Sequence, residues 1–96
     1  MRSYWVYMVL CDDGSYYIGI THDVEHRVWQ HNEGTDPRSY TFTRRPVTLV
    51  HAMEFSEVDR AISWEKQLKG WSRKKKAALV RGDFAELKRL ARSHSA

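Results

Sequence analysis

Three observations predict that this chain folds as a small α/β domain. Two segments near the N-terminus are rich in aromatic and β-branched residues, as strands are, and a three-residue loop separates them. A third segment of alternating apolar residues lies near the middle of the chain. Segments with the periodicity of amphipathic helices follow the second and third strands and fill the C-terminal part. With 96 residues, the chain suffices for one domain with a modest core and is too short for two.

The first two strands are expected at residues 4–11 and 15–20. Between them, Asp12-Asp13-Gly14 suits a three-residue hairpin loop, in which the glycine adopts the left-handed conformation of a bulge. This loop length fixes which residues of the two strands face each other.

The resulting register places Tyr7 opposite Gly19 and puts Tyr7 and Tyr17 on the same face of the hairpin. Gly19 leaves a gap beside Tyr7, which either admits a ligand or simply tolerates a twisted strand. The other face is uniformly apolar and is assigned to the core; it consists of Val6, Met8, Leu10, Ile18 and Ile20.

A helix capped by Thr21 or Asp23 is expected to run to about Asn32. At 3.6 residues per turn, Arg27 and His31 border its buried stripe instead of facing open solvent.

A polar, turn-rich loop over residues 35–45 ends at Pro46. The third strand is expected from Val47 to Phe55, with Val47, Leu49, His51 and Met53 alternating along it.

A second helix is expected from Ser56 to about Gly70, with an inner stripe of Val58, Ala61, Ile62 and Leu68. Glu65 falls close to the centre of that stripe. An ionised carboxylate held there without a partner would cost several kcal/mol. We therefore expect a cation or strong hydrogen-bond donors beside Glu65.

A third helix is expected from Ser72 to about Arg81, and a fourth over residues 84–93. We expect residues 1–82 to form the domain, with residues 83–96 as a C-terminal helix and tail that packs on it or extends from it.

The formal net charge of +4 permits an anionic partner, although a basic helix face that is merely solvated remains the alternative. If the partner is DNA, the residues expected to contact its backbone are Arg44, Arg45, Lys69, Arg73, Lys74 and Lys75. Cys11 is the single cysteine, so no internal disulfide is expected. Neither a secretory signal nor a long apolar segment is recognisable, so we expect a cytoplasmic protein without a membrane partner.

The candidate catalytic residues are Tyr7, Tyr17, Arg27, His31 and Glu65. Cleavage of a phosphodiester needs an activated water, charge relief on the phosphoryl oxygens and stabilisation of the leaving oxygen. Glu65 can hold one Mg²⁺ (or Mn²⁺), Arg27 can bind the phosphate, and a tyrosine or His31 can take the proton of the water. No small-molecule cofactor is expected.

Each of these residues also has an ordinary structural role open to it. The tyrosines can be half-buried strand residues, and Arg27 can pair with Asp23 on its own helix. Glu65 can form a buried ion pair with Arg27 and bind no metal. A zinc site of His22, His26 and His31 is disfavoured, since His22 precedes the helix and no cysteine pair supports it.

Taken together, these positions resemble the GIY-YIG nuclease superfamily, and in particular its small stand-alone members. The similarity covers nearly all of residues 4–81, including "WVYMVLCDDGSYYIGITHDVEHRVWQHN", "TRRPVTLVH" and "AISWEKQLKGWSRKKKAAL". The first motif survives only as the tyrosine of Trp5-Val6-Tyr7, whereas the second is intact as Tyr17-Ile18-Gly19.

This resemblance implies a three-stranded antiparallel sheet flanked by helices and Mg²⁺-dependent cleavage of DNA. Tyr7 would be the general base and Glu65 the only metal ligand from the protein. Arg27 would stabilise the transition state, while Tyr17 and His31 would orient the water and the phosphate.

Our expectation is a metal-dependent DNA endonuclease acting in DNA repair or processing. A nucleic-acid-binding module on the same fold, with weak or no turnover, is the alternative. It is favoured by Ile20, where several nucleases of this superfamily have lysine or threonine, and by the lack of an asparagine beyond Glu65. A protein-interaction adaptor with basic C-terminal helices is a second alternative.

Overall fold

A computed structural model of the protein describes residues 2–93. The strands are β1 (Tyr4–Leu10), β2 (Tyr16–Thr21) and β3 (Thr48–Phe55). The helices are α1 (Val24–Glu33), α2 (Val58–Lys69), α3 (Arg73–Arg81) and α4 (Phe84–Ser93), and the loop before β3 contains the 3₁₀ turn η1 (Phe42–Arg44). Within the described residues, no helix combines the length and apolar character needed to cross a bilayer.

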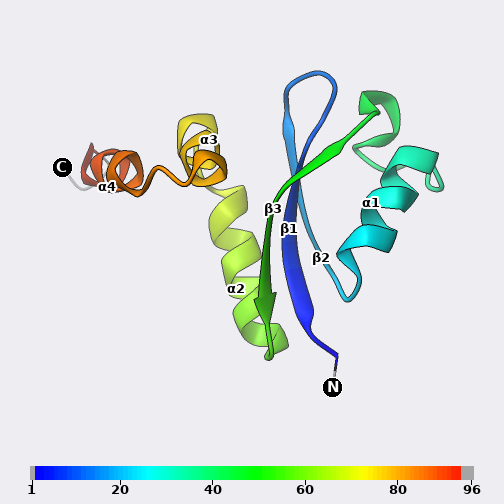
Figure 1. The fold of residues 1–96 in the computed structure, drawn as a ribbon, viewed down its shortest axis with the longest axis horizontal. Coiled ribbons are helices and arrows are strands. Elements are labelled where there is room, and N and C mark those ends of the chain that lie inside the picture. The colour runs from blue at the N-terminus through cyan, green and yellow to red at the C-terminus, as the bar shows by residue number, and fades with distance from the viewer. Residues whose placement is uncertain (1, 94–96) are drawn as a thin grey trace.

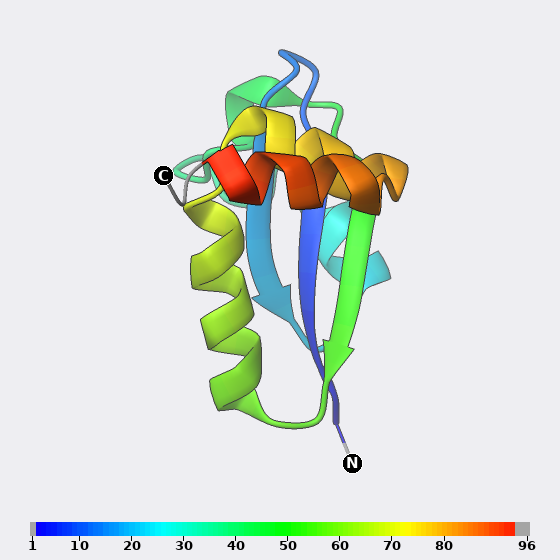
Figure 2. The same ribbon diagram turned by 90° about the vertical axis from the view of Figure 1, so that its left-hand side faces the viewer.

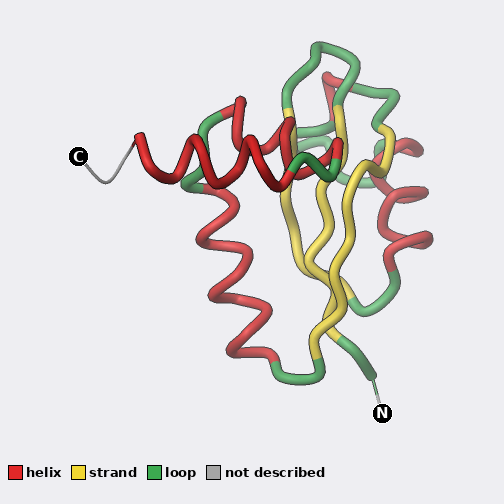
Figure 3. Tube along the Cα trace, turned by 60° about the vertical axis from the view of Figure 1, so that its left-hand side comes forward, coloured by secondary structure: helices red, strands yellow, loops and turns green. Residues whose placement is uncertain are grey.

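The three strands form one antiparallel sheet in the order β2-β1-β3, so β1 is central (Figure 3). Helix α1 lies on one side of the sheet and α2 on the other (Figure 1). Figure 2 shows that α2 runs along the strands, whereas α3 and α4 cross their direction near one end of the sheet. The expected three-stranded antiparallel sheet flanked by helices is confirmed.

The β1–β2 hairpin has the register that its loop length predicts. Tyr7 faces Gly19, and the backbone N–H of Cys11 donates to Ser15 O at 2.8 Å. Gly14 adopts the left-handed conformation with φ 85°, which costs a residue without a Cβ atom little. Tyr7 and Tyr17 therefore lie on the same face of the hairpin, as expected from the sequence.

Both faces of the sheet are buried, whereas the sequence pattern indicates one apolar face only. On the α2 side the buried residues are Val6, Met8, Ile18, Ala61 and Leu68. On the α1 side they are Tyr7, Val9, Cys11 and Val47, packed with Tyr17, Val24 and Val28. The face that carries the tyrosines is thus a second core, and this burial governs the chemistry of the site.

Helix α2 begins later than predicted and turns a different stripe inward. Its first residue is Val58 and Glu57 occupies the N-cap position, so the start predicted at Ser56 is wrong. Val58 and Ile62 are 41% and 37% exposed, and the half-buried Trp64 packs against the core in their place. The true inner stripe is therefore centred on Ala61 and Leu68, with Glu65 beside it.

The alternation predicted for the third strand is also wrong, because the ladder between β1 and β3 contains a bulge. Val9 pairs with Leu49 but Met8 pairs with His51, so Val50 is an extra residue. Val50 packs against the core, whereas Leu49 and Met53 are 40% and 47% exposed.

The helix ends agree with the local sequence. Asp23, not Thr21, caps α1, and its carboxylate accepts from His26 N at 3.0 Å. The Ser72 hydroxyl accepts from Lys75 N and caps α3. Helix α4 packs on α3 and lies at the far side of α3 from the sheet (Figure 1). The end of the tail predicted beyond this helix, residues 94–96, lies outside the described residues.

Candidate active site

The centre of the site is a buried pair formed by Tyr7 of β1 and His31 of α1. Tyr7 is 1% exposed and His31 is 4% exposed. The Tyr7 hydroxyl oxygen lies 2.9 Å from His31 Nε2. The pair forms because α1 packs on the tyrosine face of the central strand and presents His31 in its last turn.

A third residue, Thr41, completes this pair from the loop before β3. Its Oγ1 lies 2.7 Å from His31 Nδ1, and the residue is 1% exposed. Ser39 Oγ lies 3.1 Å from the same hydroxyl. The sequence prediction did not include Thr41. A buried histidine needs partners for both ring nitrogens, and the hydroxyl residues of this loop are the signal from which one could have been sought.

Tyr17 lies beside the pair on the same face of the sheet. Its ring centroid is 6.4 Å from that of Tyr7 and 5.1 Å from that of His31, the latter in an edge arrangement. On its outer side, Tyr17 is stacked with Tyr40 at 6.0 Å.

Gly19 does not leave an open gap, because the ring of Tyr7 fills the space. A Cβ atom at Gly19 would lie 2.6 Å from the Tyr7 hydroxyl oxygen. Of the two interpretations open from the sequence, a ligand site at Gly19 is therefore excluded. The missing side chain allows the phenol to lie across β2 toward the edge of the sheet.

Arg27 lies one turn before His31, and its charge acts on both members of the pair. Its Nη1 donates to Gln30 Oε1 at 3.1 Å, so the predicted alternative of a side-chain pair with Asp23 does not form. The guanidinium lowers the pKa of Tyr7, and it also lowers the pKa of His31.

Burial dominates the protonation of the pair. It raises the pKa of Tyr7 to about 12, with the neighbouring Tyr17 adding to this rise, Arg27 opposing it and the charge of Glu65 adding a smaller rise. Burial also lowers the pKa of His31, and the positive charge of Arg27 adds to this effect. At neutral pH the resting pair is thus a neutral phenol hydrogen-bonded to a neutral imidazole.

Glu65 of α2 lies near enough for its charge to act on Tyr7. Its side chain is 19% exposed, and its Oε2 lies 3.3 Å from Lys69 Nζ. The expected cationic partner therefore exists and is Lys69, one turn further along the same helix. The predicted alternative of an ion pair between Glu65 and Arg27 does not form.

A single carboxylate is what this site can offer a divalent ion. Within residues 2–93, no three or more histidine, cysteine, aspartate or glutamate side chains cluster as metal ligands. Mg²⁺ retains several water ligands and often binds through one or two carboxylates. Glu65 therefore fits it when the ion pair with Lys69 is broken. Zinc does not fit, because His22 Nδ1 bonds to Ser3 O and both ring nitrogens of His31 are engaged.

A groove of about 190 Å³ opens beside Tyr17. Its walls combine aromatic rings with two lysines: Tyr16, Tyr17, Ile18, Tyr40, Lys69 and Lys76. The groove thus lies between β2, the loop before β3 and helices α2 and α3.

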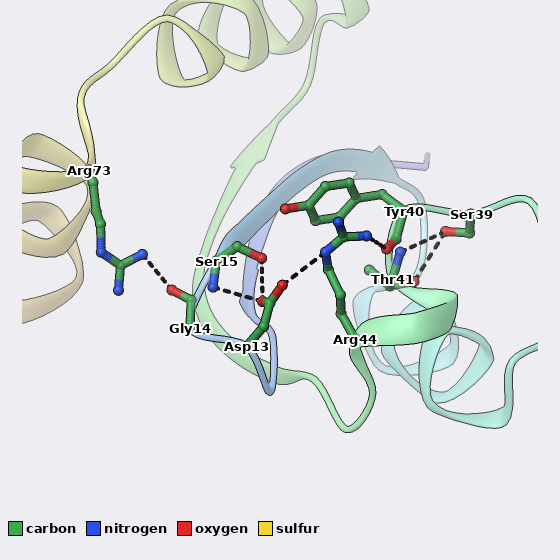
Figure 4. Close-up of polar contacts among 8 residues, drawn as sticks. All are labelled: Asp13, Gly14, Ser15, Ser39, Tyr40, Thr41, Arg44 and Arg73. Carbon is green, nitrogen blue, oxygen red and sulfur yellow. Dashed lines mark hydrogen bonds and ion pairs between the residues drawn. The ribbon is translucent and has the colours of Figure 1, made fainter.

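All three arginines predicted to contact DNA make contacts within the protein. Arg44 pairs with Asp13 at 2.9 Å and donates to Tyr40 O at 2.7 Å (Figure 4). Arg73 donates to Gly14 O from the other side of the same hairpin loop (Figure 4).

The third arginine, Arg45, donates to Phe42 O at 2.8 Å and lies over the Phe42 ring. The predicted lysines differ from one another. Lys69 pairs with Glu65, Lys75 lies over the Trp71 ring at 5.2 Å, and Lys74 is exposed.

The α+β fold, in which β1 and β2 of a three-stranded antiparallel sheet carry the two tyrosine motifs, is that of the GIY-YIG class of domain. Residues 3–78 match the family model described as the GIY-YIG catalytic domain, so the chain belongs to this family of a nuclease superfamily. The resemblance inferred from the sequence is confirmed.

Within the family, the chain is similar to UPF0213 proteins. It is 40% identical to one from Staphylococcus saprophyticus over 80 residues, which cover 83% of this chain and 96% of that protein. It is 41% identical to one from Staphylococcus aureus over 81 residues, covering 84% and 98% of the two chains.

Two solved structures share the fold. The solution NMR structure of a UPF0213 protein from Bacillus halodurans superimposes with a TM-score of 0.56 at 38% identity, over 84% of this chain and 85% of that one. The solution NMR structure of a protein from E. faecalis gives a TM-score of 0.57 at 30% identity, over 100% and 91% of the two chains.

Proposed function

We propose that this protein is an endonuclease that hydrolyses phosphodiester bonds of DNA with the help of Mg²⁺ (or Mn²⁺). The observation that carries the proposal is the buried pair of Tyr7 and His31, beside which lie both Arg27 and the charge of Glu65. Membership of the GIY-YIG family, whose superfamily consists of nucleases, supports phosphodiester hydrolysis as the reaction. The net charge of +4 suits a polyanionic substrate.

In this proposal Tyr7 accepts a proton from the attacking water while its own proton passes to His31 Nε2. The phenol cannot act as a preformed phenolate, since its pKa is raised to about 12. The transfer to His31 keeps the tyrosine neutral overall, and the imidazole holds the proton only briefly, because burial and the charge of Arg27 lower its pKa. The hydroxide adds to phosphorus, the bond to the leaving oxygen breaks, and the leaving oxygen takes a proton from solvent. His31 then releases its extra proton to solvent, which restores the neutral resting pair.

Arg27 binds the phosphate oxygens on which negative charge develops, and Tyr17 orients the phosphate from the same face of the sheet. Glu65 would hold the metal ion, which when bound supplies Lewis-acid relief of charge on the phosphoryl group.

The basic residues hold the DNA backbone in this scheme. Lys69 and Lys76 line the groove beside Tyr17, and the exposed Lys74 extends the same charge over α3. Such contacts fix the position of the substrate without reading its sequence. We propose that the enzyme serves DNA repair or processing in the cytoplasm.

The alternative of a binding module with little turnover is favoured by one observation. The Glu65 carboxylate already has a cationic partner in Lys69 at 3.3 Å, which competes with a metal ion for it.

A nicking assay decides between the two functions. Purified protein, supercoiled plasmid and Mg²⁺ are expected to give nicked circles, and Glu65→Gln is expected to reduce the rate by about a hundredfold or more. Glu57→Gln, an exposed position at the start of α2, is the matched control and should cleave like the wild type. If Glu65→Gln nicks as fast as the wild type, the enzyme proposal fails. If neither the wild type nor Glu65→Gln nicks the plasmid although both bind DNA, the protein is a binding module.

A further inference from the structure

We propose that Thr41 is a positioning residue, which holds His31 in the tautomer that carries its proton on Nδ1 and so leaves Nε2 free to accept the proton of Tyr7. The catalytic consequence rests on the proposed nuclease function, whereas the tautomer itself does not.

The first step is that the two ring nitrogens of His31 must have different roles, one as a hydrogen-bond donor and the other as an acceptor. Its two ring nitrogens each face one hydroxyl, Tyr7 at 2.9 Å from Nε2 and Thr41 at 2.7 Å from Nδ1. Burial and the charge of Arg27 lower its pKa, so the ring is neutral and carries a single N–H. One nitrogen therefore donates and the other accepts, and the direction decides whether the imidazole can act as a base toward Tyr7.

The second step concerns the Tyr7 oxygen. The charge of Arg27 lowers the pKa of this phenol, and a guanidinium can only donate hydrogen bonds, so it offers the Tyr7 O–H no acceptor. Within residues 2–93, His31 Nε2 is the acceptor that faces the Tyr7 hydroxyl. If Nε2 carried the proton, the buried Tyr7 O–H would lack an acceptor, which is costly in a residue only 1% exposed. The Tyr7 proton therefore points to Nε2.

The third step concerns the other end of the chain of hydrogen bonds. Thr41 Oγ1 has Ser39 Oγ as a second neighbour at 3.1 Å. When Nδ1–H donates to Thr41, the threonine hydroxyl is free to donate to Ser39, and every group in the chain from Tyr7 to Ser39 has a partner. The opposite direction leaves Tyr7 without one.

The fourth step is that Thr41 is held rigidly enough to impose this direction. Its backbone N–H donates to Ser39 Oγ, and it precedes the η1 turn, in which Arg44 N donates to Thr41 O at 2.9 Å. Arg44 also bonds to Tyr40 O and to Asp13, and thereby ties this loop to the β1–β2 hairpin (Figure 4). The hydroxyl that faces His31 is thus fixed from the hairpin that also carries Tyr7.

Nitrogen NMR of protein labelled with ¹⁵N-histidine tests the tautomer directly, because a protonated ring nitrogen and a bare one differ widely in chemical shift. In the wild type at neutral pH we expect His31 to be protonated at Nδ1 and bare at Nε2. A spectrum with Nε2 protonated overturns the proposal. This measurement needs no variant and no catalytic activity.

Variants then test the role of Thr41. Thr41→Val keeps the shape of the side chain but removes the acceptor of Nδ1–H. Each tautomer then leaves one buried group without a partner, so we expect the preference for the Nδ1 tautomer to be lost. With plasmid DNA and Mg²⁺, kcat should fall about tenfold while KM stays unchanged. Thr41→Ser restores the hydroxyl and should restore both tautomer and rate. Thr43→Val, at an exposed position two residues on, is the control.

The outcomes separate this inference from the proposed function. If the wild type has no nuclease activity, the proposed function is contradicted. If Thr41→Val in the same experiments loses the preference for the Nδ1 tautomer, the positioning role is still supported. An active enzyme whose tautomer and rate are unchanged in Thr41→Val contradicts the positioning role alone. If Thr41→Val does not fold, the wild-type spectrum and the Thr41→Ser variant still decide.

Discussion

A Cβ atom at Gly19 would lie 2.6 Å from the hydroxyl oxygen of Tyr7 and 2.8 Å from its Cζ, so the glycine of the second motif makes room for the tyrosine of the first. The two residues face each other across the β1–β2 ladder. The ring of Tyr7 cannot retreat cheaply, because it is buried on the α1 side and its hydroxyl is hydrogen-bonded to His31.

The first prediction is therefore that Gly19→Ala displaces Tyr7. We expect a loss of about 1–3 kcal/mol in the free energy of unfolding, since overfilling a close-packed site forces side chains out of position. Nicking of plasmid DNA should fall with it, because the displaced phenol no longer meets His31. Urea denaturation and the nicking assay measure the two effects.

Gly70→Ala is the matched control, since an added Cβ there would have ordinary contacts at 3.5 Å or more. A stable, fully active Gly19→Ala protein would show that the Tyr7 ring can move and that Gly19 is dispensable.

The second prediction concerns pH and the buried histidines. Burial lowers the pKa of both His31 and His51 below the ordinary value. The unfolded chain thus binds these protons more readily than the folded protein does. The free energy of unfolding should be at its full value above about pH 6.5 and decline as the pH falls from there toward the lowered pKa values.

His51 offers the cleaner test, because within the described residues its Nε2 is buried without a hydrogen-bond partner. Denaturant unfolding at pH 5–8 should show a smaller pH dependence in His51→Phe than in the wild type, by up to about 1.4 kcal/mol per pH unit. His26→Gln, on the exposed face of α1, should keep the wild-type slope. An unchanged slope in His51→Phe would contradict this assignment.

The parts of the fold and site that the sequence predicted are those set by local geometry. The loop length before Ser15 fixes the register of Tyr7 and Tyr17, and a helical wheel suffices to place His31 and Arg27 at the border of a buried stripe. Glu65 stood out because its position on the wheel is apolar in character. Each of these inferences needs only the neighbours of a residue along the chain.

The parts that failed depend on how distant segments meet. The face of α2 that is buried depends on how the helix packs against the sheet. Val58 and Ile62 are therefore exposed, although their spacing along the helix suits a core. The partner of His31 is Thr41, which comes from a loop without periodicity. Arg44 and Arg73 look like free charges in a basic sequence, yet the hairpin loop engages both (Figure 4).

The third prediction is that Lys69 competes with the metal ion for Glu65. Their ion pair is half-exposed and has a contact of 3.3 Å, so it is worth at most about 1 kcal/mol. Lys69→Gln should therefore bind Mn²⁺ about two- to fivefold more tightly, as measured by calorimetry or by the electron spin resonance of free Mn²⁺. Lys66→Gln, an exposed neighbour on α2, is the control. Equal Mn²⁺ affinities in all three proteins would contradict this prediction, since they would mean that breaking the Lys69–Glu65 ion pair costs no measurable free energy.

The fourth prediction separates a structural arginine from a lysine that contacts DNA. Arg44 holds Asp13 and Tyr40 O, so Arg44→Gln should lower the free energy of unfolding by about 1 kcal/mol and leave the salt dependence of DNA binding unchanged. Lys74 is exposed on α3, so Lys74→Gln should leave stability unchanged. It should reduce the slope of log K against log salt by about 0.9, the value for one lost phosphate contact.

Asp13→Asn completes the comparison, because it removes the ion-pair partner of Arg44 without removing a positive charge. It should reproduce the loss of stability seen in Arg44→Gln. If Arg44→Gln instead reduces the salt slope and Asp13→Asn does not destabilise the protein, the pair opens when DNA binds. In that case Arg44 contacts the phosphate backbone, as the basic sequence around it predicts, and the hairpin loop is released in the complex.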